Sequence, residues 1–256
     1  METITSRQNP LMTHIRKLAG SAAYRRQTGQ CLCDSPKLLR EAAQWGAEVQ
    51  TVVSVEPWPE PLPEKVRQVL VPPEVMASIS PAKTPQGVLF TCRVPVLPVP
   101  ETLPGRRYVV LDGVQDPGNV GTLLRSAAAF GFDGVLLSDG CASVFAPKTL
   151  RASMGAAVRI PVIEAGKMPE AIALLREKDI TCLAAALYQS QPLSAAASSY
   201  PDGVCVVIGS EGQGLTDETI AACTGTVRIP MTDRVESLNA GIAGSILLWH
   251  FREESL

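Results

Sequence analysis

Short apolar runs alternate with amphipathic stretches along most of the chain, and this alternation is clearest in the second half. Runs typical of buried strands lie at Tyr108–Leu111, Gly134–Leu137, Val158–Ile163, Ile180–Ala186, Val204–Ile208 and Val227–Ile229. Helical periodicity separates them over Gly121–Phe130, Met168–Lys178, Thr216–Ala222 and Leu238–Phe251. Strands separated by helices predict a mostly parallel sheet with helices on both faces. This pattern alone favours a doubly wound α/β fold, since the handedness of crossover connections normally excludes knots.

The first half carries the same two periodicities in shorter elements. Strands are expected at Thr51–Val55, Gln68–Val71 and Gly87–Val94, and helices at Pro10–Leu18 and Lys37–Trp45. These elements predict a small α/β domain. Between the halves, Arg93–Gly105 contains four prolines, which remove backbone donors and favour an extended chain. We therefore expect a first domain over residues 1–95, a linker over 96–106 and a second domain over 107–256.

The composition is globular, but the charge is unevenly distributed. Of 256 residues, 46% are hydrophobic and 19% charged, which suits one large or two ordinary domains. The net charge of -2 conceals a basic start: residues 1–40 contain seven basic and two acidic side chains, whereas residues 101–256 contain 12 basic and 17 acidic. A basic segment of this kind indicates an anionic partner, with nucleic acid the natural candidate, or simply a solvated helix face.

The seven cysteines lie mostly inside apolar runs, where a free thiol packs as a small hydrophobe. Cys31 and Cys33 form a CxC without a second pair or a nearby histidine, so no metal site is expected. No secretory signal and no apolar run of about 18 residues is found in the sequence. These observations predict a reduced, cytoplasmic protein that does not span a membrane.

Three loops that follow strands carry the candidate chemistry. They read DPGNVGTLLRSA at Asp116–Ala127, IGSEGQGL at Ile208–Leu215 and IPMTDRVESLNAGIAGSI at Ile229–Ile246. Loops at the carboxyl ends of parallel strands bind ligands in open α/β sheets, so together they predict one pocket. The glycine order of the second loop, GxxGxG, differs from the dinucleotide-binding GxGxxG, and no Walker lysine motif is present. An apolar floor at Pro230 and Met231 with nearby backbone groups suits an adenine and a sulfonium better than a triphosphate.

Each loop residue also has a purely structural interpretation. Arg125 lies about one and a half helical turns after Asn119, and it either pairs with a carboxylate at the sheet rim or offers a planar donor fork to a ligand. Ser237 or Asn239 can cap the following helix. The glycines of the second loop can form an ordinary strand-to-helix turn. With two histidines in the chain, histidine acid–base catalysis is not favoured.

Taken in order, DPGNVGTLLRSA, KTLRASMGA at Lys148–Ala156, IGSEGQGL and IPM…ESLN closely resemble the SpoU/TrmH-type RNA 2′-O-ribose methyltransferases of the SPOUT superfamily. The resemblance covers residues 106–251 and extends to ITSRQNPLMTHIRKL near the start, which looks like the opening of the family's RNA substrate-binding domain. It implies a deep C-terminal trefoil knot, S-adenosylmethionine held in a bent shape, and a homodimer whose partner helps complete the active site. The implied knot conflicts with the doubly wound fold expected from the pattern alone.

The resemblance also implies roles for individual residues. Catalytic positions are expected at Asn119, Arg125, Glu211, Ser237 and Asn239. The S-adenosylmethionine site is expected at Gly209, Gly212, Gly214, Ile229, Met231 and Leu238, chiefly through backbone groups. RNA contacts are expected at Arg7, Asn9, Arg16, Lys17, Arg25, Arg26, Lys148 and Arg151. Similar family members are proposed to activate the ribose 2′-hydroxyl with the arginine. Because an arginine pKa of roughly 12 or more hinders proton abstraction, we expect Arg125 to stabilise the developing alkoxide.

The chain departs from the family pattern at three places, and several functions remain open. Asp34-Ser35 replaces a usual Glu-Gly, Asp233 replaces a usual glycine, and Asn239-Ala240-Gly241 replaces an Asn-Val-Ser run. The leading hypothesis is methylation of a ribose 2′-hydroxyl in rRNA. The alternatives are a tRNA 2′-O-methyltransferase and a catalytically silent RNA-binding protein of the same fold. A nicotinamide-dependent oxidoreductase is disfavoured because the dinucleotide fingerprint is missing after the first strand of the second half.

Overall fold

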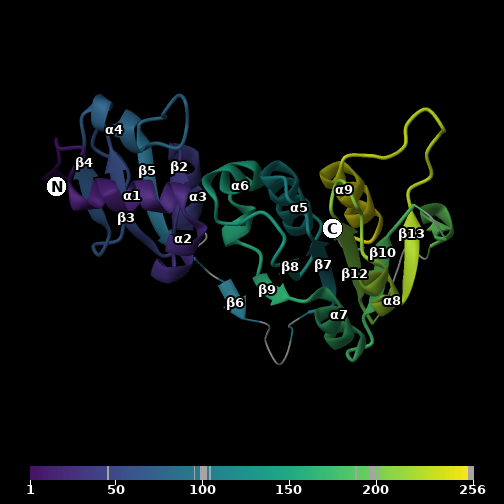
Figure 1. Cartoon of the computed structure of the whole chain (residues 1–256). Coiled ribbons are helices and arrows are strands. Elements are labelled where there is room, and N and C mark those ends of the chain that lie inside the picture. The colour runs from purple at the N-terminus through teal and green to yellow at the C-terminus, as the bar shows by residue number, and fades with distance from the viewer. Residues whose placement is uncertain are drawn as a thin grey trace. The chain divides into compact units, whose positions relative to one another are not determined.

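The structure is a computed structural model that describes residues 1–44, 46–94, 96–98, 103, 105–187, 189–196, 200 and 202–252. It divides into two compact units, shown in Figure 1. Unit 1 comprises Met1–Val94 with Ser143–Val158, and unit 2 comprises Pro95–Ala142 with Arg159–Leu256. Residues 99–102 and 104 of the predicted linker, and Trp45 of a predicted helix, lie outside the described residues. The roles expected for these ranges, RNA substrate binding for residues 1–95 and methyl transfer for residues 107–256, stay predictions.

Unit 1 is built on a five-stranded sheet in the order β1-β4-β3-β5-β2. The strands are β1 (Glu2–Thr3), β2 (Gln30–Asp34), β3 (Val49–Ser54), β4 (Arg67–Leu70) and β5 (Val88–Arg93). Its helices are α1 (Pro10–Gly20), α2 (Ala22–Thr28), α3 (Pro36–Gln44), α4 (Pro73–Ile79) and, from the second segment, α6 (Pro147–Ser153). The strands and helices predicted for the first half are confirmed with ends displaced by at most two residues, whereas β1, β2, α2, α4 and α6 of this unit were not predicted.

Helix α1 shows how the sequence fixes this unit. Its start is set by Asn9, whose side chain accepts a hydrogen bond from the Leu11 N–H at 2.8 Å, and by Pro10 in the first turn. Apolar side chains recur at helical spacing and are fully buried against the sheet, at Met12, Ile15 and Leu18. Burying each of them contributes about 1.5–3 kcal/mol, so the helix is held by packing on the sheet more than by its own propensity.

Unit 2 contains an eight-stranded sheet in the order β11-β13-β10-β12-β7-β8-β9-β6. The strands are β6 (Val96–Pro98), β7 (Arg107–Asp112), β8 (Gly134–Ser138), β9 (Val162–Gly166), β10 (Thr181–Ala185), β11 (Gln191–Pro192), β12 (Val204–Gly209) and β13 (Gly225–Arg228). Adjacent strands pair in parallel throughout the described part of this sheet, which confirms the predicted parallel arrangement. The central strand β12 is buried along its whole length, as its continuous apolar sequence predicts.

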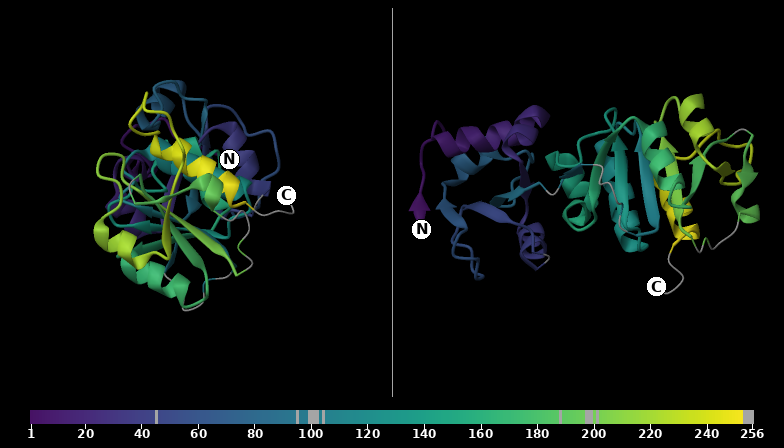
Figure 2. Two further views of the ribbon diagram at one scale, coloured as in Figure 1. Left: turned by 90° about the vertical axis from the view of Figure 1, so that its right-hand side faces the viewer. Right: turned by 90° about the horizontal axis from the view of Figure 1, so that it is seen from below.

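Helices cover both faces of this sheet. Helices α5 (Pro117–Ala129) and α9 (Ala240–His250) pack together on one face, and α7 (Met168–Arg176) and α8 (Asp217–Ala222) pack on the other. The left view of Figure 2 shows the strands of unit 2 with the yellow α9 on one side and the green α7 and α8 on the other. The α/β class expected from the sequence is therefore confirmed, while the implied trefoil knot stays a prediction.

Two elements in the second half begin four residues away from the position expected from the sequence. Helix α5 begins at Pro117 rather than Gly121, because the Asp116 side chain accepts from the Asn119 N–H at 3.0 Å and caps the helix. Strand β9 begins at Val162, after a 3-10 turn over Ala156–Val158 that the apolar run had concealed. No helix in the described part of the chain is long and apolar enough to cross a membrane.

Candidate active site in unit 2

The second glycine loop forms a tight turn directly after β12. Ser210 and Gly214 exchange two backbone hydrogen bonds, each 3.0 Å long, and Gly214 has a positive φ of 70°. A Cβ atom on Gly209 would lie 2.3 Å from the Gly214 carbonyl carbon, so a side chain at Gly209 is excluded by backbone rather than by a movable side chain. The glycines therefore fix the turn that carries Glu211.

Glu211 joins the second loop to the first. Its Oε1 atom accepts hydrogen bonds from Asn119 Nδ2 at 2.8 Å and from the Asp116 N–H at 3.2 Å, and its Oε2 atom accepts from the Gln115 N–H at 3.2 Å. Partial burial raises the pKa of the Glu211 carboxyl, but hydrogen bonds from Asn119 and from nearby backbone N–H groups outweigh burial and lower that pKa below its usual value. The carboxylate is therefore ionised at neutral pH and holds the two loops together.

The third loop approaches Asn119 of the first loop at the start of α9. Asn239 caps this helix, because its Oδ1 atom accepts from the Ile242 N–H at 3.2 Å. A Cβ atom on Gly241 would lie 3.1 Å from Asn119 Oδ1 and 3.2 Å from Asn239 Oδ1. The family departure at Gly241 thus lies where the first and third loops are in close contact, and a larger residue would displace one of the two asparagines by a few tenths of an ångström.

The structure brings three of the five expected catalytic residues together, whereas Arg125 and Ser237 take no part in these contacts. Asn119, Glu211 and Asn239 gather around Gly241 through the contacts given above. Arg125 is exposed on α5, about 9 Å along the helix from Asn119, and has no hydrogen bond or ion pair among the described residues. Ser237 is also exposed. The rim carboxylate that would have explained Arg125 structurally is therefore not found in the described part of the chain.

The third loop also offers unused backbone donors. From Ile229 to Asn239, every residue is described and none of the backbone N–H groups donates a hydrogen bond within the described residues. In the same segment the side chains of Ile229, Met231 and Leu238 are half-buried. Backbone groups without protein partners beside apolar side chains fit the adenine and amino-acid ends of the expected cofactor, S-adenosylmethionine. Gly212 and Gly214 leave open space where side chains would otherwise stand.

Sequence reasoning missed the residues that hold these loops in place. Asp116 caps α5 and also donates its N–H to Glu211. Asp112, at the end of β7, accepts from the Thr219 hydroxyl at 2.8 Å and thereby fixes α8. The signal for Asp116 was available, since an Asp-Pro pair directly before a helical pattern is typical of a helix start. The link between Asp112 and Thr219 joins distant parts of the sequence and leaves no local signal.

The expected RNA-binding residues lie in unit 1, and their surroundings differ. Exposed members are Arg7, Lys17, Arg26 and Lys148. Asn9 caps α1, and Arg16 is half-buried and donates to the Arg7 carbonyl at 2.8 Å. Arg25 is only 6% exposed and donates to the Leu18 carbonyl at 2.7 Å, so its guanidinium is engaged inside the unit. Arg151 pairs with Asp34 at 2.5 Å. We therefore leave Arg25 and Arg151 out of the proposed RNA surface.

Comparison with known proteins agrees with this geometry. Residues 106–249 match the model of the SpoU rRNA Methylase family, and residues 9–89 match that of the MRM3-like substrate binding domain. The chain is 32% identical to an uncharacterized tRNA/rRNA methyltransferase of Synechocystis sp., over 98% of this chain and 94% of the relative. It is 27% identical to the 23S rRNA (guanosine(2553)-2′-O)-methyltransferase RlmP of Bacillus subtilis, over 98% of this chain and 100% of that protein.

Solved structures give the same result for the fold. The crystal structure of an AdoMet-bound rRNA methyltransferase from Sinorhizobium meliloti superposes with a TM-score of 0.86 at 27% identity, covering 98% of this chain and 97% of that chain. A putative RNA methyltransferase of the TrmH family from Porphyromonas gingivalis superposes with a TM-score of 0.82 at 31% identity, covering 94% and 96%. Because the family model spans more than half of the chain and carries all three loops, the protein belongs to the SpoU rRNA methylase family.

Proposed function

We propose that this protein transfers a methyl group from S-adenosylmethionine to a ribose 2′-hydroxyl of rRNA. The observation that carries the proposal is the convergence of three loops at Asn119, which bonds Glu211 and adjoins Gly241. Membership of the SpoU family supports methyl transfer, and the named activity of the Bacillus subtilis relative supports a ribose 2′-hydroxyl of rRNA. The tRNA alternative lacks a comparable full-length relative of named specificity among the proteins described above.

The chemistry proposed for the residues follows from their surroundings. When bound, S-adenosylmethionine supplies an electrophilic methyl group. Glu211 is ionised and orders the first loop through three accepted hydrogen bonds, so it acts as a positioning residue. The planar guanidinium of Arg125 has no hydrogen-bond partner among the described residues, so it would orient the ribose hydroxyl and stabilise negative charge on the hydroxyl oxygen as that oxygen attacks the methyl group. The backbone N–H groups from Ile229 to Leu238 would hold the cofactor.

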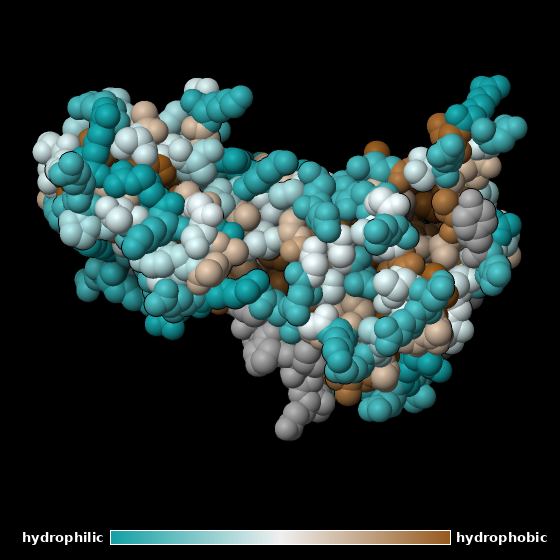
Figure 3. Space-filling view, in the orientation of Figure 1, coloured by the Kyte–Doolittle hydropathy of each residue, from teal (hydrophilic) through white to brown (hydrophobic). Residues whose placement is uncertain are grey.

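The homodimer is proposed on the exposed face of α5 and α9. Ile242, Ile246 and Trp249 follow helical spacing on α9 and are 54%, 37% and 53% exposed. Figure 3 shows hydrophobic surface in the region of α9. Helix α5 lies against α9, with the hydroxyls of Ser126 and Ser245 2.8 Å apart, and it carries Arg125. A second copy on this face would bury the apolar stripe and bring Arg125 into the interface, beside the partner's site.

Size-exclusion chromatography with light scattering tests the dimer. Ile246→Glu together with Trp249→Glu should give a monomer, because two carboxylates would be buried without partners. Leu174→Glu is a matched control, since Leu174 is 41% exposed on α7, away from this face. A dimer that persists in the double variant would place the interface elsewhere.

The remaining parts of the proposal concern RNA and location. The exposed basic residues Arg7, Lys17, Arg26 and Lys148 form the proposed RNA surface of unit 1. Their replacement by alanine should reduce both RNA affinity and its dependence on salt, because each phosphate contact releases counterions. The proposed location is the cytoplasm, where rRNA is modified in bacteria and where the seven free cysteines would remain reduced.

Labelled methyl transfer to purified rRNA and tRNA tests the function. Arg125→Lys should lose most turnover and keep its affinity for S-adenosylmethionine, since lysine lacks the planar fork. Arg176→Lys is the matched control, because the Arg176 guanidinium donates to the Ala222 carbonyl on the opposite face of the sheet. Unchanged turnover in Arg125→Lys would refute the role of Arg125. Transfer to tRNA alone would favour the tRNA alternative, and cofactor binding without transfer to any RNA would favour a silent RNA-binding protein.

A further inference from the structure

A polar cavity of about 490 Å³ lies in unit 1, at the edge of the sheet where β2, β3 and β4 begin. The polar residues that line it are Asn9, His14, Gln30, Gln50, Thr51 and Arg67. This volume falls within the range of about 300–1,000 Å³ that is usual for small-ligand pockets. The cavity is made entirely from residues of unit 1, and the methyl-transfer chemistry proposed for unit 2 uses none of its walls.

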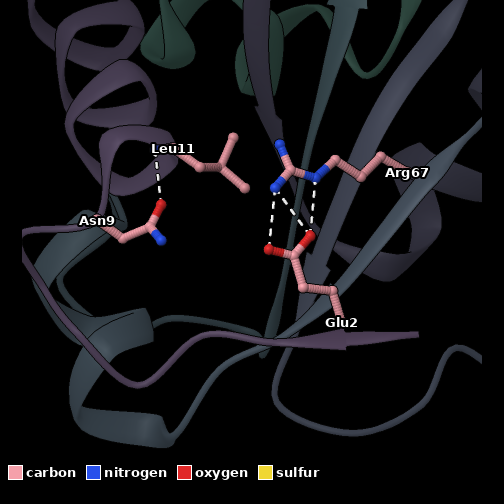
Figure 4. Close-up of polar contacts among 4 residues, drawn as sticks. All are labelled: Glu2, Asn9, Leu11 and Arg67. Atoms are coloured by element: carbon pink, nitrogen blue, oxygen red, sulfur yellow. Dashed lines mark hydrogen bonds and ion pairs between the residues drawn. The ribbon is translucent and has the colours of Figure 1, made fainter.

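The charge of the cavity is close to neutral. Arg67 is the arginine among the described lining residues, and it donates three hydrogen bonds to the Glu2 carboxylate, with N···O distances of 2.8 to 3.1 Å. Figure 4 shows this pair, with the Leu11 side chain extending from α1 toward the guanidinium. A guanidinium already paired with a carboxylate is a poor site for a free phosphate, and its remaining N–H groups act as neutralised donors. The cavity therefore favours an uncharged polar group.

Two side-chain amides, those of Asn9 and Gln30, present N–H donors that have no hydrogen-bond partner among the described residues. The Asn9 side chain accepts from the Leu11 N–H through Oδ1, which leaves Nδ2 without a partner among the described residues. The His14 ring contacts the Tyr24 hydroxyl at 2.9 Å and Gln30 Oε1 at 3.0 Å. The amide oxygen of Gln30 is therefore engaged, whereas its Nε2 group has no partner among the described residues. Both amides are held in place by these bonds, so their N–H groups are preorganised toward a ligand.

Gln50 supplies a complementary acceptor. Its Oε1 atom is buried and has no hydrogen-bond partner among the described residues, although the side chain lines the cavity. A buried amide oxygen without a donor is unfavourable, and rotation of the side chain into the adjoining cavity would allow it to accept from a ligand N–H. Thr51, the next residue of β3, adds a hydroxyl that can donate and accept. The cavity thus combines fixed donors with an acceptor that needs a donor.

We propose that this cavity binds the base of one unstacked nucleotide of the substrate RNA. Asparagine and glutamine amides match the paired donors and acceptors along base edges, and single-stranded RNA is read through bases that are splayed out of the stack. Lys17, one helical turn after His14 and 5.4 Å from the Tyr24 ring centroid, provides a cation for the adjoining phosphate. The inference rests on the proposed function, because it assigns a specificity site for that substrate.

Binding of RNA to the full-length protein without cofactor tests the cavity. The probes are a short mixed-sequence single-stranded RNA and the fully paired duplex of the same sequence, followed by fluorescence anisotropy. Gln50→Leu removes the amide and keeps the bulk, and Asn9→Asp keeps the helix cap and removes the N–H donor. Each variant should weaken single-strand binding about tenfold and leave duplex binding unchanged. Gln68→Leu, the same substitution on β4 outside the cavity, should bind like the parent protein.

Stability measurements separate this site from a structural role. Gln50→Leu should unfold at the same urea concentration as the parent or a higher one, because an unpaired buried oxygen is removed. Single-strand binding that is unchanged in both cavity variants, or a parallel loss of duplex binding, would overturn the proposal. The proposed methyl transfer is judged separately: a protein that methylates no RNA but loses single-strand binding in Gln50→Leu would refute the activity and retain the cavity.

Discussion

The hydrogen bond between Asn119 and Glu211 predicts a measurable energetic coupling between the first and second loops. A hydrogen bond to a charged carboxylate is worth about 1.5–3 kcal/mol when both groups are buried. Asn119 is 8% exposed, but Glu211 faces solvent, so we expect only about 1 kcal/mol. The variants are Asn119→Ala, Glu211→Ala and the double variant, and the free energy of unfolding of each is measured in urea at neutral pH.

The double-mutant cycle should show that the two losses are not additive, because either single substitution already removes the bond. The pKa of Glu211 is lowered in the folded protein, so its carboxylate contributes stability above the unfolded pKa. That contribution, and with it the coupling, should fall as the pH drops through the lowered pKa. The control is a second cycle that combines Asn119→Ala with Glu236→Ala, because Glu236 is an exposed carboxylate of the third loop. A coupling within about 0.3 kcal/mol of zero at neutral pH would refute the reasoning.

Three further substitutions test the packing described above, each by urea unfolding. Gly209→Ala should cost about 3 kcal/mol or more, because its Cβ would meet the backbone of Gly214 and Leu215; a smaller loss would mean that the turn can open. Gly244→Ala should cost about 1 kcal/mol of stability, because its Cβ would clash with the side chains of Leu123 and Ile208. This overpacking exceeds the gain of up to about 1 kcal/mol in helix propensity. Adding Leu123→Val should recover part of the lost stability. Arg151→Ala should cost about 1–3 kcal/mol by leaving the buried Asp34 carboxylate unpaired, and adding Asp34→Asn should restore most of that loss.

Much of the fold was predictable from local sequence, and the failures have identifiable physical causes. Six of the eight strands of unit 2 were predicted, because a strand buried on both faces must be apolar throughout, as β12 is, whereas the short β6 and β11 were not predicted. Strand β2 was missed because QCLCD combines buried thiols with the polar Gln30 and Asp34. Helix α6 was missed because its buried positions include Thr149 and Ser153, which are polar and pack inside unit 1. Hydropathy cannot identify such elements, since their buried polar groups are satisfied by hydrogen bonds, locally for Thr149 and Ser153 and through the distant Arg151 for Asp34.

The candidate site was predictable only in part. Loop position at the strand ends predicted that the three motifs would share a pocket, and the contacts among Asn119, Glu211 and Gly241 confirm that they meet. The roles of the individual residues stay predictions. Periodicity gave no indication that Arg25 would turn inward to the Leu18 carbonyl, because a basic residue on a short helix has the same pattern whether it faces water or the core. The cavity at Gln50 was also hidden, since its walls come from α1, β2, β3 and β4.

Unit 1 is built from two separate segments of the chain, and this limits how the protein can evolve by recombination. Ser143–Val158 belongs to unit 1, although it lies within the segment that matches the SpoU methylase family. It contributes the Arg151 guanidinium to Asp34 and the Ser143 hydroxyl to Arg25. A recombination event that replaced only residues 1–94 with those of a relative would leave these partners mismatched. New substrate specificities are therefore expected to arise by point substitution, or by paired exchange of both segments, rather than by a single crossover.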